Sequence, residues 1–301
     1  MVSGCLLHSC VMAALLLCFL SPSAHALEAK RGCPKRIVSL NLASDEILVD
    51  LVEGGRIAGI TYLSANAKLS NVSERISGLN ATVRANLETI VELEPDVVVL
   101  AKFSHPDFVL QLRNAGIRLV LLEYFESIDG IKKNIRLIGE AVCEQDKAAA
   151  LIKGMETELE AISRTLPEKA GRPRVLYFSP AGFTAGSSIV GDIIEYAGGI
   201  NVVAEAGIIG NRKISLEFII ELDPDVIVMN SYSPERPDSA KRLIEETVLK
   251  HSTAVKSGRV YLIDDKYLIG ASHYVVNGIR VLHSRFYPPQ ENNEEINDER
   301  H

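Results

Sequence analysis

Residues 86–100 read NLETIVELEPDVVVL, and residues 215–229, which lie 129 positions further along the chain, read SLEFIIELDPDVIVM. Nine of these fifteen positions are identical. Each copy predicts a short helix with Asn86 or Ser215 as its N-cap, a stop at Pro-Asp and a buried β-branched strand. Such dense identity at a fixed offset predicts two related halves of α/β type.

Short apolar runs alternate with helical stretches on both sides of the two copies. The first strand is expected at residues 36–41 (RIVSLN), and the helix after it at 44–53 with Ser44 as its cap. This β-α-β alternation is typical of parallel sheets with helices on both faces. Between the halves, residues 127–166 are nearly all helix formers without proline, and Cys143-Glu144 is expected to divide them into two helices.

The sequence therefore predicts an α/β fold with two Rossmann-like lobes, each with a parallel sheet, bridged by one long α-helix. A cleft is expected between the lobes. The predicted organisation is a signal peptide (1–26), an N-terminal lobe (27–143), the bridging helix and linker (144–171), a C-terminal lobe (172–288) and a polar, disordered tail (289–301).

The N-terminus has the features of a secretory leader. Residues 11–20 form an unbroken apolar run, VMAALLLCFL, which is too short to span a bilayer, and Ala24-His25-Ala26 follows it. We therefore expect cleavage after Ala26 and a periplasmic location. Only Cys33 and Cys143 remain in the mature chain, and in an oxidising compartment they are either disulfide-bonded or two separate thiols.

Composition and charge narrow the class of partner. The 301 residues are 47% hydrophobic and 24% charged, which is enough for sizeable cores and excludes a disordered chain. A net charge of -7 and a pI near 5.6 argue against a nucleic-acid partner. No apolar run after the leader approaches the length that a transmembrane helix needs, so no membrane insertion is expected.

Four motifs, in this order and spacing, resemble one family. They are R-I-V-S-L-N at 36–41, N-L-E…L-x-P-D-V-V at 86–98, F-T-A-G…D-I-I-x-x-A-G-G-x-N at 183–201, and S-L-E…L-x-P-D-V-I at 215–227. The chain resembles the extracytoplasmic substrate-binding proteins of ABC importers for ferric siderophores, haem and cobalamin over residues 36–285. The resemblance implies a class III periplasmic binding protein, a monomer without enzymatic activity or cofactor, which docks on the importer's membrane permease subunits.

The resemblance also implies a role for two acidic residues. The family presents one Glu per lobe in the N-L-E or S-L-E turn, which pairs with arginines of the permease, and here these are Glu88 and Glu217. Read from the residues alone, each acid simply complements the dipole of a helix N-terminus.

The ligand is expected at the carboxyl ends of the strands, where open α/β sheets bind their ligands. Aromatic side chains there suit stacking on a macrocycle or chelate, and cationic side chains suit carboxylates, phosphates or an anionic ferric complex. His273 offers an axial metal ligand, although a lone His is more often structural, and no protein metal site is predicted. The candidate ligand-binding residues are Asn41, Tyr62, Arg84, Lys102, Phe103, Phe183, Thr184, Arg212, Tyr232, Tyr267 and His273.

Several ligand classes stay open at this point. Haem binders of the family often carry a Tyr seven residues before the first docking Glu, where this chain has Ala81, and cobalamin binders often use cleft tryptophans, which it lacks. The prediction is a ferric siderophore or a corrinoid, with haem or a transition-metal ion as the alternative. The transition-metal alternative is the weaker one, because only two histidines, His105 and His273, fall in the loops that border the expected cleft. An exported hydrolase is disfavoured, because residues 182–186 (GFTAG) have Thr in place of the nucleophilic Ser.

Overall fold

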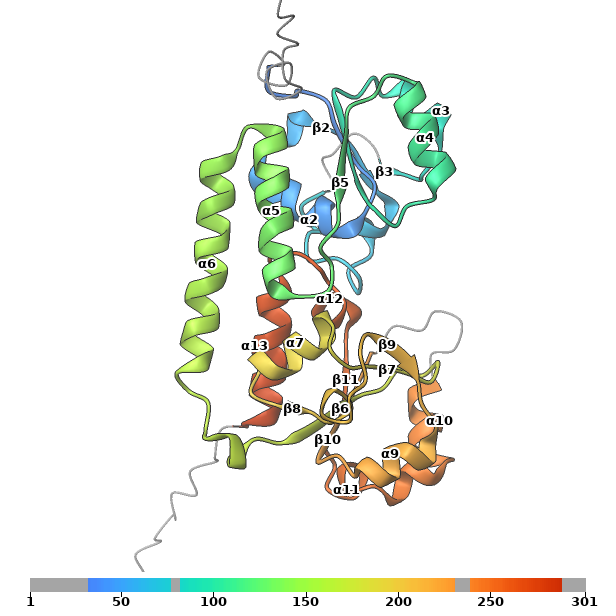
Figure 1. Ribbon diagram of the computed structural model, residues 1–301, viewed down its shortest axis with the longest axis vertical. Helices are drawn as coiled ribbons and strands as arrows, with labels where there is room; N and C mark the ends of the chain where they lie inside the picture. The colour runs from blue at the N-terminus through green and yellow to red at the C-terminus, as the bar shows by residue number, and fades with distance from the viewer. Residues whose placement is uncertain (1–31, 77–81, 231–238, 289–301) are drawn as a thin grey trace, which may run out of the picture. The chain divides into compact units, whose positions relative to one another are not determined.

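Five parallel strands in the order β3-β2-β1-β4-β5 form the sheet of the N-terminal half (Figure 1). The computed structural model describes residues 32–76, 82–230 and 239–288. The strands are β1 (Ile37–Ser39), β2 (Ile57–Thr61), β3 (Thr82–Val83), β4 (Val97–Ala101) and β5 (Leu119–Leu122), and the helices are α2 (Leu42–Leu51), α3 (Leu87–Glu92) and α4 (Pro106–Asn114). Every residue of β1 and β4 is buried, which accounts for the continuous apolar run in β4.

A second parallel sheet, in the order β11-β10-β6-β8, forms the C-terminal half. Its strands are β6 (Arg174–Tyr177), β8 (Ile200–Asn201), β10 (Val226–Asn230) and β11 (Val260–Ile263). The helices around it are α7 (Ile189–Tyr196), α8 (Val202–Glu205), α9 (Leu216–Leu222), α10 (Ser239–Glu245), α11 (Thr253–Lys256), α12 (Asp265–Leu268) and α13 (Val275–Phe286). The predicted class, α/β with parallel sheets, is confirmed.

Two details differ from the prediction. The cap of α2 is Asn41 rather than Ser44: the Asn41 side chain accepts a hydrogen bond from the Ser44 N–H (3.0 Å), and the Ser44 hydroxyl bonds Ser39 instead. The second difference is an antiparallel pair, β7 (Phe183–Ala185) with β9 (Asn211–Lys213), which lies outside both parallel sheets. Neither short strand has a run of β-branched residues that would have indicated it.

The internal repeat has the same hydrogen bonds in both halves. The Asp96 carboxylate accepts from the N–H of Arg36 (2.9 Å), and the Asp225 carboxylate, at the matching position, accepts from the N–H of Arg174 (2.8 Å). Both guanidinium groups then donate to a carbonyl at the end of the repeat helix, that of Leu93 or Leu222. In each half, the repeated Asp and the Arg that it pairs with thus tie the repeat helix to the start of the first strand.

Helices α5 (Ile128–Val142) and α6 (Gln145–Ser163) connect the halves and run side by side (Figure 1). The buried residues of α6, which begin at Ala148 and end at Ile162, recur every three or four positions and form one apolar stripe. Helix α6 contacts α5 as well as α7 and α13, so it packs on both halves. From Cys33 onward the described residues form one compact unit, and one of their clusters of buried apolar side chains contains residues of both halves, among them Ile37 and Phe286.

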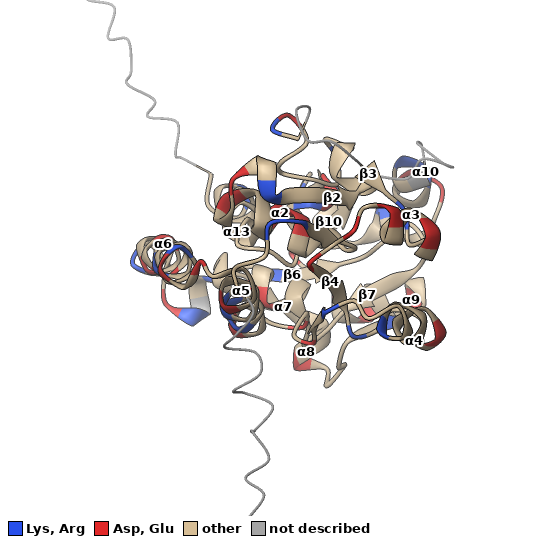
Figure 2. Ribbon diagram, turned by 90° about the horizontal axis from the view of Figure 1, so that it is seen from above, with Lys and Arg blue, Asp and Glu red and all other residues tan. Residues whose placement is uncertain are grey.

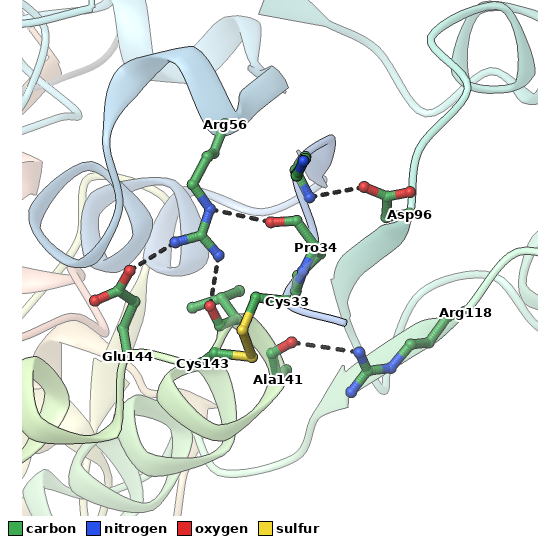
Figure 3. Close-up of a disulfide and its surroundings, with 10 residues drawn as sticks. Cys33, Pro34, Arg56, Asp96, Arg118, Ala141, Cys143 and Glu144 are labelled. Atoms are coloured by element: carbon green, nitrogen blue, oxygen red, sulfur yellow. Dashed lines mark hydrogen bonds and ion pairs between the residues drawn. A yellow bond between two sulfur atoms is a disulfide. The ribbon is translucent and has the colours of Figure 1, made fainter. Parts of the chain in front are cut away.

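A disulfide joins Cys33, just before β1, to Cys143, which lies between α5 and α6 (Figure 3). Their Cα atoms are 5.6 Å apart. Carbonyl groups at the end of α5 accept from two arginines beside the disulfide, Val142 from Arg56 (2.5 Å) and Ala141 from Arg118 (3.3 Å). Of the two states that the sequence left open, the structure has the bonded one.

Removing this disulfide is expected to lower the free energy of unfolding by about 2–5 kcal/mol, because it closes a long loop in the unfolded chain. The two cysteines are 110 residues apart in sequence. Urea unfolding of the Cys33→Ser/Cys143→Ser variant measures the loss. Reductant should lower the midpoint of the wild type and leave the variant unchanged, and equal midpoints for the oxidised and reduced wild type would contradict the assignment.

Candidate functional site

Tyr62 begins the turn that follows β2, a 3-10 helix at Tyr62–Ala65. Its side chain is 44% exposed. The guanidinium carbon of Arg84, the residue after β3, lies 3.9 Å from the centre of the Tyr62 ring. Because β2 and β3 are parallel neighbours, their carboxyl ends meet at one edge and bring an aromatic and a cationic side chain together.

Lys102 and Phe103 follow β4 at the same edge of the sheet. Phe103 is 77% exposed, and its ring meets the edge of Phe125, which follows β5, at 5.1 Å between centroids. The Lys102 ammonium lies 3.0 Å from the Glu123 carboxylate. The carboxyl edge of the N-terminal sheet therefore carries exposed aromatic residues and both signs of charge.

In the C-terminal half, the β7–β9 pair carries a similar combination. Phe183 is 40% exposed, and the Lys213 ammonium lies 5.2 Å from the centre of its ring. Arg212, also exposed, pairs in register with Thr184. Thr184 itself is fully buried, and its hydroxyl donates to the Tyr177 carbonyl at 2.6 Å. The structure thus places Thr184 in the interior, and we leave it out of the proposed site.

The other candidates differ in how free their side chains are. Asn41 uses its side-chain oxygen to cap α2, whereas its buried amide nitrogen lacks a partner among the described residues. Tyr267 is half-buried, with the Lys266 ammonium 5.1 Å from its ring centre. Tyr232 lies outside the described residues.

His273 belongs to a polar contact between the two halves, which the sequence did not reveal. Its Nε2 lies 2.8 Å from the Asp50 carboxylate on α2, its ring stacks on Tyr274, and the side chain is only 9% exposed. The Tyr274 hydroxyl donates to the same carboxylate at 2.8 Å, and Arg75 pairs with it at 2.7 Å. The Nε2 atom of His273 is thus engaged within the protein, and we leave His273 out of the proposed ligand site.

The contact continues along α2 and the segment after β2. Buried Glu46 accepts from the hydroxyl of Ser272 and from the Asn71 N–H (2.7 Å). The N–H of Lys266 donates to the Lys68 carbonyl at 3.0 Å. Two buried or half-buried carboxylates of one helix thus hold the start of the last helix.

The Asp50 carboxylate should make stability depend on pH. Burial raises the pKa of Asp50, but hydrogen bonds from His273, Arg75 and Tyr274 lower it well below the ordinary 3.8. A lowered pKa means that the ionised form stabilises the folded chain above pH 4, and that this contribution is lost as pH falls further.

We expect Asp50→Asn to lower the free energy of unfolding by about 1–3 kcal/mol at pH 7 and by somewhat less at pH 3, because the folded carboxyl group, with its lowered pKa, is still ionised there while that of the unfolded chain has largely taken up a proton. Urea unfolding at the two pH values measures the difference, with Glu53→Gln, an exposed acid just after α2, as the control. An equal loss for Asp50→Asn at both pH values would contradict the assigned ionisation.

The two predicted docking acids are exposed and occupy matching positions. Glu88 lies in the first turn of α3 and Glu217 in the first turn of α9, after the caps Asn86 and Ser215. Figure 2 shows acidic residues on α3. Hydrogen bonds from its own N–H and from the Ser215 hydroxyl lower the pKa of Glu217. A charged carboxylate is therefore available on α9.

A pocket of about 400 Å³ lies at the opposite, amino-terminal edge of the C-terminal sheet and is lined by Arg172, Asp225, Arg259 and Tyr287 among others. It is separate from the exposed aromatic residues described above.

Within the described ranges, no group of three or more His, Cys, Asp or Glu side chains could hold a metal ion. Nor does the described part of the chain contain a helix long and apolar enough to cross a membrane.

Comparison with known proteins identifies the class. The model of the periplasmic binding protein family matches residues 37–267, and the chain belongs to this family. A cobalamin-binding protein of Halobacterium salinarum is 27% identical over 258 residues, which cover 84% of this chain and 70% of that protein. An uncharacterised ABC transporter substrate-binding lipoprotein of Bacillus subtilis is 26% identical over 85% of this chain and 81% of its own length.

The fold has close counterparts among solved structures. The periplasmic haem-binding protein RhuT from Roseiflexus sp. RS-1, in its apo form, matches with a TM-score of 0.73 and 27% identity, covering 84% of this chain and 98% of that one. These comparisons confirm the predicted family and the architecture of a class III periplasmic binding protein. The chain is thus a solute-binding protein of the ABC importer type.

Proposed function

We propose that this protein binds a metal chelate, a ferric siderophore or a corrinoid, with haem as the alternative, through stacking on aromatic side chains and pairing of the ligand's anionic groups with cationic ones. The ligand would lie at the carboxyl edges of the two sheets, between the halves. The observation that carries the proposal is the exposed Tyr62 ring with the Arg84 guanidinium 3.9 Å from its centre. Such a pair offers a stacking face and a charge for a carboxylate or phosphate in one place.

The other exposed groups at these edges extend the same chemistry. Phe103 and Phe183 add aromatic area, and Lys102, Arg212 and Lys213 add positive charge. Binding of this kind needs no covalent step, because burial of aromatic surface provides affinity and a few charged groups orient the ligand. We therefore propose binding without catalysis.

Delivery is the second part of the proposal. Glu88 and Glu217 are exposed, one in each half, on helices that are equivalent in the internal repeat. Two carboxylates so placed suit a pair of arginines on the membrane subunits of an ABC importer. We propose that the chain works as an exported monomer, released from its leader after Ala26.

Calorimetric titration with cobalamin, cobinamide, haem, ferric citrate and a ferric hydroxamate tests the ligand class. We expect at least one of them to bind with a Kd of about 1 μM or tighter. If all five bind more weakly than about 100 μM while a sugar or peptide binds tightly, the proposed ligand class is wrong.

A further inference from the structure

Asp45 lies directly beneath the turn that presents Tyr62. It belongs to the first turn of α2 and is fully buried. One carboxylate oxygen, Oδ2, accepts three hydrogen bonds: from the Thr61 N–H (3.0 Å), the Thr61 hydroxyl (2.6 Å) and the Ser64 hydroxyl (2.6 Å). The donors belong to the residue before Tyr62 and to one two positions after it, so a single oxygen fixes both sides of Tyr62.

We propose that Asp45 is the positioning residue of Tyr62 in the ligand site, and that binding or release of a proton by its carboxyl group changes how firmly the Tyr62 turn is held. Asp45 does not itself touch the ligand. The inference rests on the proposed function, because it assumes that Tyr62 contacts the chelate.

The surroundings of Asp45 favour a change in its protonation near neutral pH. Its second oxygen, Oδ1, is buried without a hydrogen-bond partner among the described residues. Burial raises the pKa of Asp45 to about 7, although hydroxyl groups of Ser39, Ser64 and Thr61 oppose this. The neighbouring acid on α2, Glu46, is engaged by Asn71 and Ser272.

The groups that face Asp45 from β1, β2 and the Tyr62–Ala65 turn are therefore uncharged hydroxyls and a backbone N–H. Above pH 7 the carboxylate is ionised, and charge strengthens its three hydrogen bonds to the turn. Below pH 7 the proton taken from solvent neutralises it and weakens them. The turn should be held most firmly when Asp45 is ionised, and most loosely in mildly acidic solution.

The absence of tryptophan from the chain allows a direct test. In a Tyr62→Trp variant the introduced indole is the only tryptophan, and acrylamide quenching of its fluorescence reports how firmly the turn is held. We expect quenching to decrease as pH rises, with a midpoint near 7. Adding Asp45→Asn, which keeps an acceptor oxygen but cannot ionise, should remove this midpoint.

Two further variants keep the test specific. Ser64→Ala removes a hydrogen bond that favours the ionised form, so it should move the midpoint to higher pH. Asp192 is another acid whose pKa is raised by burial, and its carboxylate accepts a hydrogen bond from the Ile128 N–H. Asp192→Asn should leave the midpoint in place. A midpoint that persists with Asp45→Asn, or no midpoint in the Tyr62→Trp protein, would overturn the inference.

The five chelates of the calorimetric panel are titrated in parallel into the Tyr62→Trp protein and the wild type. If a chelate binds the wild type but the indole does not titrate through Asp45, the inference fails and the proposed function stands. If the indole titrates through Asp45 but no chelate binds either protein, the proposed function fails, and with it the role of Asp45 in a ligand site.

Discussion

Reversing the charge of both docking acids, with Glu88→Lys and Glu217→Lys together, is expected to abolish ligand import and leave ligand affinity unchanged. Both carboxylates are exposed in the first turn of their helices, so lysine there disturbs no buried contact. At the permease, each substitution would replace an attraction by a like-charge repulsion, which costs several kcal/mol. Uptake of the bound chelate into proteoliposomes that contain the cognate importer measures the effect.

The matched control is Glu92→Lys with Glu221→Lys. These acids are also exposed, lie on the same two helices and are equivalent in the repeat, but they lie one turn further from the N-termini. We expect this pair to support import at a rate close to that of the wild type. Loss of ligand affinity in the Glu88→Lys/Glu217→Lys protein would instead place these acids in the ligand site.

Removing the Tyr62 ring, with Tyr62→Ala, is expected to weaken binding of the chelate by at least about tenfold, which corresponds to about 1.4 kcal/mol. The loss has two causes: a stacking surface disappears, and Arg84 loses the ring that lies 3.9 Å from its guanidinium carbon. Calorimetric titration of the variant with the tightest ligand of the panel measures the change.

Tyr196→Ala is the control for this variant. Tyr196 is 40% exposed, close to the exposure of Tyr62, but it ends α7 and lies away from the carboxyl edges of the sheets. We expect its removal to leave affinity unchanged. An equal loss for Tyr62→Ala and Tyr196→Ala would show that the ligand does not contact the Tyr62 turn.

Much of the fold could be predicted because buried strands are visible in the sequence as short runs of apolar residues. All of β4 and the first four residues of β10 are apolar, since both faces of a parallel sheet are covered, and the repeat marked the equivalence of the two strands. The cap of α2 was misassigned because Asn41 and Ser44 are both good caps. The structure distinguishes them, because the Asn41 side chain accepts from the Ser44 N–H while the Ser44 hydroxyl bonds Ser39.

The site was less predictable because it depends on side-chain partners that are distant in sequence. His273 seemed available in a cleft loop, but its partner Asp50 is 223 positions away. Thr184 follows Phe183 on a short strand, and alternation turns one side chain outward and the next inward. The role of Asp45 was hidden for the same reason, since its donors Thr61 and Ser64 come from a different element.

Hydroxyl-radical footprinting of the protein with and without its tightest chelate tests where the ligand binds, because one experiment reports on every exposed aromatic side chain. We expect slower oxidation of Tyr62, Phe103 and Phe183 in the complex, and unchanged oxidation of Tyr196. Protection of Tyr196, with Tyr62, Phe103 and Phe183 oxidised at their free rates, would contradict a ligand site at the carboxyl edges of the two sheets.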